Sequence, residues 1–69
     1  MSQLARRIIS KNVKFYREKA KLKREELSLM INRDNSYISK LEREKINITI
    51  DSLELISNVL KINIVDLFK

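Results

Sequence analysis

Residues 34–43, with the sequence DNSYISKLER, contain the side chains of this chain that are best suited to recognising another molecule. Ile38 and Leu41 lie three positions apart, so on a helix they share one face and would pack against a core. Asp34 can cap the start of such a helix. The other face carries amide, hydroxyl and ammonium groups, from Asn35, Ser36, Tyr37, Ser39 and Lys40. A short helix with so many exposed hydrogen-bond donors and acceptors is better suited to binding the surface of another molecule than to keeping a protein in solution.

Catalysis and metal binding lack the residues that they usually need. The chain contains no His and no Cys, so disulfides are excluded and a zinc or other transition-metal site has almost no ligands. Adjacent carboxylates such as those of Glu25 and Glu26 point to different sides of a helix and form no acid–base pair. We therefore expect no enzyme, no metal, no cofactor and no small-molecule ligand.

Length and composition predict a single, all-helical domain over residues 1–69. A chain of 69 residues has room for one domain with a small core. Abundant Leu, Ile, Lys and Glu favour helices, and no Gly or Pro marks a linker. The longest apolar runs are too short to span a membrane, and the N-terminal segment MSQLARR lacks the apolar part of a secretion signal. We therefore expect a cytoplasmic protein.

The positive charge is concentrated in the first third of the chain. The net charge is +6, and residues 1–24 hold nine Lys or Arg residues against one Glu. A basic field of this kind attracts polyanions, either nucleic acids or anionic membrane surfaces. A well-solvated basic helix would have the same distribution, so charge alone does not separate these alternatives.

Apolar residues at helical spacing predict five helices. The first covers residues 3–20, and the second ends at Asn32, a residue type that tolerates a left-handed turn. Asp34 caps the third, Thr49 the fourth, and Asn63 a brief fifth. The residues expected to face the core before this last helix are Leu4, Ile8, Ile9, Val13, Tyr16, Ala20, Leu22, Leu27, Met30, Ile31, Ile38, Leu41, Ile50, Leu53, Ile56, Val59 and Leu60.

A tight pair formed by the second and third helices is the organisation of a helix-turn-helix domain. The segments LKREEL, NRDNSYISKLER, TIDSLELISNVL and IVDLF resemble the phage-repressor and Cro-like helix-turn-helix family, also called the xenobiotic-response-element type. SYISKLER, within the second of these segments, is the most specific part of the match. The segments LER and NITIDSLELI are similar to the corresponding segments of the small controller proteins of restriction-modification systems. The resemblance implies a compact, all-α, five-helix, lambda-repressor-like domain whose second and third helices bind double-stranded DNA. It also implies a transcriptional regulator that represses, activates or does both.

Four positions depart from the pattern of this family. At the start of the second helix, Lys23 and Arg24 replace the usual Ser or Thr followed by Gln, which weakens the cap and adds two cations. Asn32 replaces the Gly of the turn and can adopt the same backbone. Arg33 replaces a small apolar residue, so its guanidinium must be exposed or lie across the surface.

A third helix placed in the major groove would bring three side chains to base edges. Asn35 can pair with adenine through two hydrogen bonds, Lys40 can donate to guanine, and Ser36 can contact several bases. Phosphate contacts, which carry no sequence information, are expected beside this helix. The residues predicted to make them are Lys23, Arg24, Tyr37, Ser39, Arg43, Lys45 and Asn47.

Two further expectations concern the scaffold. In the resembled family, an Arg near the end of the first helix pairs with a Glu of the reading helix, which implies a structural ion pair between Arg17 and Glu42. A homodimer would let two domains read an inverted repeat with half-sites about 34 Å apart. The dense apolar group at the chain end predicts the dimer interface, from Ile62, Ile64, Val65, Leu67 and Phe68.

Other functions are compatible with the same sequence. One is a small phage or plasmid repressor of the same family. Another is an antitoxin-type module that binds a protein partner and regulates its own synthesis through DNA, although no spare segment is present to wrap such a partner. The basic first helix could also bind an anionic membrane, but a core explains Tyr16 and Ala20 on its apolar face better.

Overall fold

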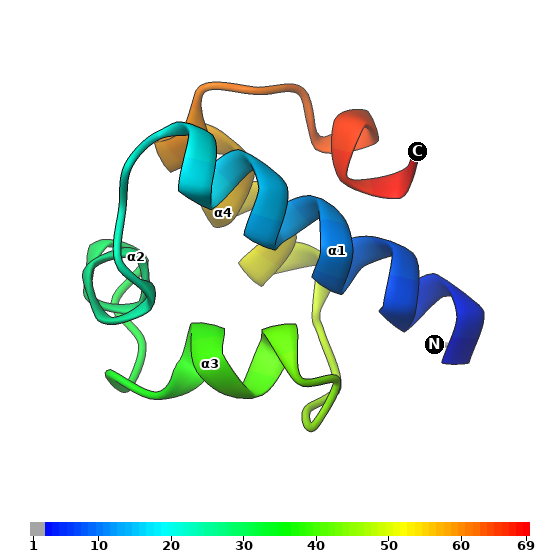
Figure 1. Cartoon of the computed structure of the whole chain (residues 1–69), viewed down its shortest axis with the longest axis horizontal. Coiled ribbons are helices and arrows are strands. Elements are labelled where there is room, and N and C mark those ends of the chain that lie inside the picture. The colour runs from blue at the N-terminus through cyan, green and yellow to red at the C-terminus, as the bar shows by residue number, and fades with distance from the viewer. Residues whose placement is uncertain (1–2) are drawn as a thin grey trace.

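The computed structural model describes residues 3–69, which form four α-helices and one short 3-10 helix (Figure 1). No strand occurs within this range, so the prediction of an all-helical fold is confirmed. Met1 and Ser2, the first residues of the segment interpreted above as lacking a secretion signal, lie outside the described residues. The elements are α1 (Gln3–Lys19), α2 (Arg24–Met30), α3 (Tyr37–Glu42), α4 (Ile50–Leu60) and η1 (Ile64–Phe68).

The fifth predicted helix forms as the 3-10 helix η1. Asn63 precedes it as expected, and the Asn63 backbone N–H donates to a carboxylate oxygen of Asp66 at 3.2 Å. η1 has only five residues, a short piece of the kind in which the tighter 3-10 turn occurs. The expectation of five α-helices is therefore corrected to four α-helices and one 3-10 helix.

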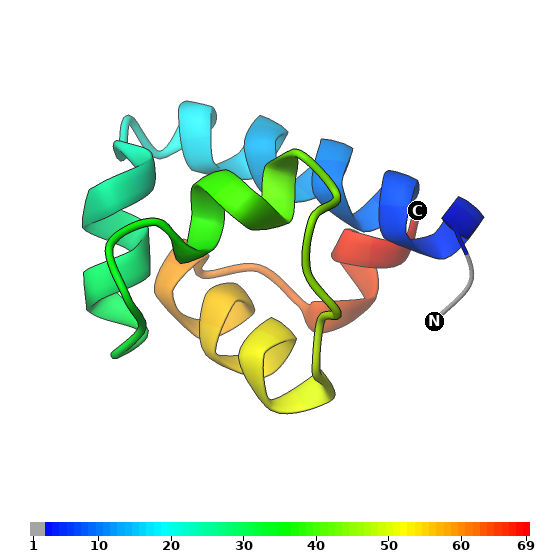
Figure 2. The same ribbon diagram turned by 90° about the horizontal axis from the view of Figure 1, so that it is seen from below.

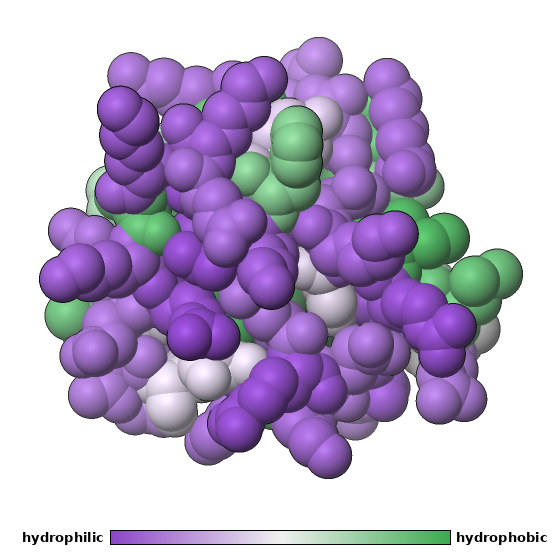
Figure 3. Space-filling model, in the orientation of Figure 1, coloured by the Kyte–Doolittle hydropathy of each residue, from purple (hydrophilic) through white to green (hydrophobic). Residues whose placement is uncertain are grey.

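α3 lies beside α1 on the outside of the molecule, and α2 packs against α3 at its start (Figures 1 and 2). η1 packs on α1 and α4, on the opposite side of α1 from α3 (Figure 1). The hydrophobic core between these elements consists of Ile9, Val13, Leu27, Ile31, Ile38, Leu41, Ile48, Leu53, Ile56, Leu60 and Leu67. Polar side chains cover most of the face viewed in Figure 3, and hydrophobic atoms show there only in separate patches.

Four of the predicted core positions are exposed instead. Leu4, Ala20 and Ile50 lie at or just beyond helix ends, and the side chains of Leu4 and Ile50 are 66% and 60% exposed. Met30 is 54% exposed because the side of α2 that faces α3 is occupied by Ser28, which turns Met30 outward. Helical spacing therefore identifies the middle of each apolar stripe correctly and fails at its edges.

Every α-helix of the described chain ends in a left-handed residue that is not glycine. The φ angles are 59° at Lys21, 59° at Asn32, 60° at Glu44 and 57° at Lys61. After α4, for example, the Lys61 N–H donates to the Asn58 carbonyl and the next N–H to the Ser57 carbonyl, the two bonds of a Schellman motif. Residues other than Gly pay a steric penalty of about 1–2 kcal/mol in this conformation, although Asn tolerates it better. Three of the four helix ends are therefore strained.

Replacing Lys61 by Gly is expected to raise the free energy of unfolding by about 0.5–1 kcal/mol, because Gly removes this penalty but loses more entropy on folding. Urea denaturation followed by circular dichroism measures the change. Lys14, which is exposed in the middle of α1, provides the control, since Lys14→Gly should lower the same free energy by about 1 kcal/mol. A loss of stability in Lys61→Gly comparable to that in Lys14→Gly would contradict the strain at this helix end.

Candidate nucleic-acid interface

α3 presents one face to the core and the other to solvent. Ile38 and Leu41 are fully buried, as their spacing predicts, whereas Lys40 is exposed. Asn35 and Ser36 lie in the turn just before α3, where Asn35 is exposed and Ser36 is half-buried. The three residues predicted to read bases are therefore gathered at the start of α3 and within its first turns.

Asp34 does not cap α3, contrary to the prediction. The helix begins at Tyr37, whose N–H donates to the backbone carbonyl of Asp34 at 2.9 Å, and Ser36 occupies the cap position. The Asp34 carboxylate instead accepts a hydrogen bond from the Ser36 hydroxyl, with Oγ and Oδ2 2.6 Å apart. This bond is the main reason why the pKa of Asp34 is lowered, and the charge of Lys40, whose Nζ lies 4.0 Å from Oδ2, acts in the same direction.

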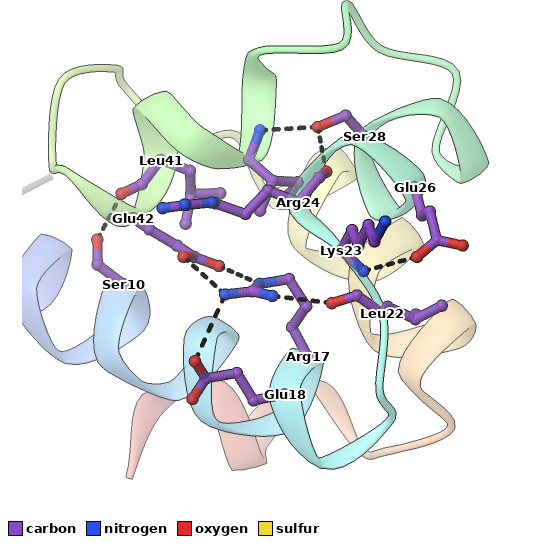
Figure 4. A network of polar contacts seen from close by, with 11 residues as sticks. Ser10, Arg17, Glu18, Leu22, Lys23, Arg24, Glu26, Ser28, Leu41 and Glu42 are labelled. Carbon is purple, nitrogen blue, oxygen red and sulfur yellow. Dashed lines mark hydrogen bonds and ion pairs between the residues drawn. The ribbon is translucent and has the colours of Figure 1, made fainter.

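A buried serine of α2 provides the hydrogen bond that a cap would make. Ser28 is fully buried, and its Oγ accepts from the Ile38 N–H at 3.0 Å while it donates to the Arg24 carbonyl at 2.8 Å (Figure 4). Amide groups in the first turn of a helix have no partner within that helix. The placement of α3 against α2 is thus fixed by a hydrogen bond as well as by packing.

The other end of α3 is bonded to α1. Ser10 is buried, and its hydroxyl donates to the Leu41 carbonyl with a distance of 2.7 Å (Figure 4). Carbonyl groups in the last turn of a helix lack an intrahelical donor, so this contact supports the C-terminal end of α3. Neither Ser10 nor Ser28 was identified from the sequence, because serine carries no signal in an apolar pattern.

Arg17 and Glu42 form a buried ion pair between α1 and the end of α3 (Figure 4). Two nitrogens of the guanidinium contact the two carboxylate oxygens, Nε at 2.7 Å and Nη2 at 3.2 Å. The side chains are only 10% and 4% exposed. A third nitrogen, Nη1, donates to the Leu22 carbonyl at 2.8 Å, so Arg17 also holds the connection into α2. Glu18 lies farther away, at 3.9 Å, and is mostly exposed.

Arg33 lies across the surface and does not extend into solvent. Its guanidinium donates to the Ser52 hydroxyl at 3.0 Å and to the Ile31 carbonyl at 3.2 Å, and it lies 5.7 Å from the centre of the Tyr37 ring. Arg33 therefore ties the turn between α2 and α3 to the start of α4. Tyr37, predicted to contact the DNA backbone, is half-buried against the core beneath this guanidinium.

The start of α3 adjoins a hollow of about 710 Å³. Two of the predicted phosphate-binding cations, Lys23 and Arg24, line it from the start of α2. Asn35, Ser36 and Ser39 line it from the side of α3. The fold thus brings predicted base-reading and backbone-contacting residues to one concave surface, although they are about a dozen residues apart in the chain.

The remaining predicted backbone contacts lie at the opposite end of α3. Arg43 and Lys45 are exposed just beyond the helix, on either side of the left-handed Glu44. Asn47 is also exposed, and its side-chain oxygen accepts a hydrogen bond from Arg6 of α1 at 2.7 Å. Arg6 was missed by sequence reasoning, and it shows that α1 also supports the loop after α3. Exposed cations consequently flank α3 at both ends.

The predicted dimer residues differ in their accessibility. Val65 and Phe68 are 53% and 42% exposed, and Ile62 and Ile64 are half-buried. Leu67 is fully buried in the core of its own chain, because η1 packs on α1 with the Leu67 side chain inward. The assignment of Leu67 to an interface is therefore corrected, and the other four residues stay a prediction.

Within residues 3–69, no three side chains of the His, Cys, Asp and Glu types are grouped so that they could hold a metal ion. No helix in this range has the length and apolar character needed to cross a membrane.

Comparison with known proteins shows which family and which solved structure the chain is similar to. A family model described as helix-turn-helix matches residues 13–67. Among solved structures, the crystal structure of the hypothetical transcription factor NHTF from Neisseria superposes with a TM-score of 0.90 at 25% sequence identity. That superposition covers 94% of this chain and 75% of the Neisseria chain. No curated protein matches the chain significantly.

Proposed function

Because the chain belongs to the helix-turn-helix family, we propose that it is a DNA-binding transcriptional regulator and not an enzyme. In this proposal, residues 1–69 are one DNA-binding domain, α2 and α3 are the helix-turn-helix, and α3 enters the major groove. We place the protein in the cytoplasm, with the DNA that it regulates.

The observation that carries this proposal is the way in which α3 is fixed. A helix of six residues is not stable on its own. Here Ser28, Ser10 and Arg17 bond it at both ends from two other helices. Its outer side carries the polar residues and is flanked by cations. A helix that is fixed in this way holds its side chains in a defined geometry. Hydrogen bonds to the edges of DNA bases require such a geometry.

Each predicted contact has a role in the proposed complex with DNA. Asn35, Ser36 and Lys40 read base edges. Phosphates are bound by residues around the base-reading side chains: Arg24 and Lys23 lie at the hollow before α3, and the others lie within α3 or just after it. These other residues are Tyr37, Ser39, Arg43, Lys45 and Asn47. The ion pair of Arg17 and Glu42 is structural and keeps α3 in place.

We further propose that two copies bind an inverted repeat. One domain of this size reaches a single half-site, and a two-fold dimer reads two half-sites about 34 Å apart. The exposed or half-buried apolar side chains of Ile62, Ile64, Val65 and Phe68 provide a surface for that contact. The resemblance of LER and NITIDSLELI to restriction-modification controller proteins supports a role of that kind.

Selection of bound sequences from random duplex DNA tests the function directly. We expect an inverted repeat whose half-sites are separated by about one helical turn. Sedimentation equilibrium of the same protein should give the mass of a dimer. Binding without any base preference at moderate salt would refute the proposal, and a monomer at high micromolar concentration would refute the dimer.

Replacing Asn35 by Ala is expected to relax the preference at one position of each half-site. Asn35 is exposed at the start of α3, and the loss of a two-bond contact with adenine should cost about 1–3 kcal/mol of discrimination there. Competition between the selected duplex and duplexes changed at single positions measures this loss. A uniform decrease in affinity for all duplexes would show instead that Asn35 contacts the DNA backbone or supports the fold.

A further inference from the structure

Asp34, in the turn before α3, and Lys40, within α3, form a pair of opposite charges on the outer side of the molecule. Asp34 Oδ2 and Lys40 Nζ are 4.0 Å apart, and the two side chains are 69% and 48% exposed. A pair as exposed as this adds little to the stability of the fold. Asp34 directly precedes Asn35 and Lys40 lies within α3, so the pair belongs to the surface that we propose to meet DNA.

A carboxylate on such a surface is unfavourable unless DNA offers it a donor. Phosphate oxygens are negatively charged and only accept hydrogen bonds, so the DNA backbone repels Asp34. The donors in the major groove are the amino groups at cytosine N4 and adenine N6. Adenine presents the acceptor N7 next to N6, whereas cytosine presents no acceptor beside N4 on that edge. Cytosine is therefore the base that suits Asp34.

Lys40 offers the complementary group. Guanine presents the acceptors O6 and N7 in the major groove, and in a G·C pair O6 lies next to cytosine N4. An ammonium and a carboxylate held side by side match this adjacent acceptor and donor. The Ser36 hydroxyl, 2.6 Å from Asp34 Oδ2, holds the carboxylate in position for the contact.

We propose that Asp34 and Lys40 together read one G·C base pair in each half-site, with Asp34 accepting from cytosine N4 and Lys40 donating to guanine O6 or N7. The inference rests on the proposed function and makes Asp34, which does not cap α3, a specificity-determining residue. Asp34 also acts against other sequences, because its carboxylate is repelled wherever no amino group faces it.

The first test uses the full chain and the sequences selected from random duplexes. We expect wild type to select G·C at one position of each half-site and to lose affinity about 5- to 100-fold when that pair is changed to A·T. Asp34→Ala and Lys40→Ala should each relax the preference at this same position, and the double variant should relax it further, because each single variant keeps the contact of the other residue. Thermal unfolding confirms that the variants fold, which the exposure of both side chains favours.

A modified base isolates the contribution of Asp34. Replacing the cytosine by N4-methylcytosine removes the amino hydrogen that faces the groove, so wild type should bind several-fold more weakly while Asp34→Ala is unaffected. Replacing the paired guanine by inosine leaves the major-groove edge unchanged and should alter the affinity of neither protein. This duplex is the matched control.

The outcomes separate this inference from the function on which it rests. If wild type selects an inverted repeat but Asp34→Ala keeps the preference that Lys40→Ala relaxes, the inference is overturned and the function stands. If Asp34→Ala strengthens binding to every duplex equally, Asp34 acts only by general repulsion, and the inference is also overturned. If wild type binds without base preference, both fail.

Discussion

Replacing Arg17 by Met is expected to lower the free energy of unfolding by about 3–5 kcal/mol, the cost of leaving a buried charge without its partner. The Glu42 side chain is only 4% exposed, and both of its oxygens contact the Arg17 guanidinium. The substitution also removes the donor to the Leu22 carbonyl, while Met retains much of the apolar stem. A loss of this size is large compared with the total stability of a small domain. Urea denaturation followed by circular dichroism measures it.

Two further variants test whether the effect arises from the buried charge. Glu18→Gln removes the other carboxylate near Arg17. Because the Glu18 side chain is 59% exposed, this substitution should change the free energy of unfolding by less than about 1 kcal/mol. Adding Glu42→Leu to Arg17→Met removes the unpaired charge and should restore most of the lost stability. A cost below about 1 kcal/mol for Arg17→Met alone would mean that the pair contributes as little as an exposed one. DNA binding that returns in the double variant would show that the pair acts only through the fold.

The affinity of wild type for its operator is expected to fall about 10³- to 10⁵-fold between 50 and 200 mM monovalent salt. Four of the predicted phosphate contacts in each protomer are cations, namely Lys23, Arg24, Arg43 and Lys45. With two protomers bound, the logarithm of affinity should decrease with the logarithm of salt concentration with a slope of about −7, since each neutralised phosphate contributes about 0.9. Fluorescence anisotropy titrations at several salt concentrations give this slope.

Arg24→Ala should weaken binding to all sequences alike and reduce the magnitude of the slope by about 2 for the dimer. Lys69→Ala is the matched control, because Lys69 lies beyond η1 on the opposite side of α1 from α3 and pairs with Asp66 at 3.3 Å. It removes the same charge without removing a predicted contact. The assignment of Arg24 is contradicted if both variants flatten the salt dependence equally.

The apolar residues predicted much of the fold because their spacing reflects packing directly. Ile9 and Val13 in α1, and Leu53 and Ile56 in α4, lie in the middle of their stripes and are fully buried. Thr49 caps α4 as predicted, since its hydroxyl accepts from the Ser52 N–H at 3.1 Å. Local signals of this kind do not depend on the rest of the chain, so sequence alone is sufficient to find them.

Apart from the ion pair of Arg17 and Glu42, which the family resemblance implied, the contacts between helices could not be predicted from the sequence. The start of α3 depends on Ser28, ten residues before Ile38, because the Ser28 hydroxyl satisfies the Ile38 amide in the first turn, where the Ser36 side chain makes no capping bond. Leu67 has the same apolar character as Phe68, and only the placement of η1 on α1 decides that one is buried and the other exposed. Such features follow from tertiary structure and leave no periodic pattern.

The bonds that hold α3 at both ends also affect how the protein would associate with DNA. The conformational entropy of ordering this helix is lost when the chain folds, so its ordering does not weaken the later encounter. Binding can then proceed as the docking of a nearly rigid surface, and the rate of association is governed by electrostatic attraction and orientation. Discrimination between operators would consequently appear in how long each complex lasts, more than in how quickly it forms.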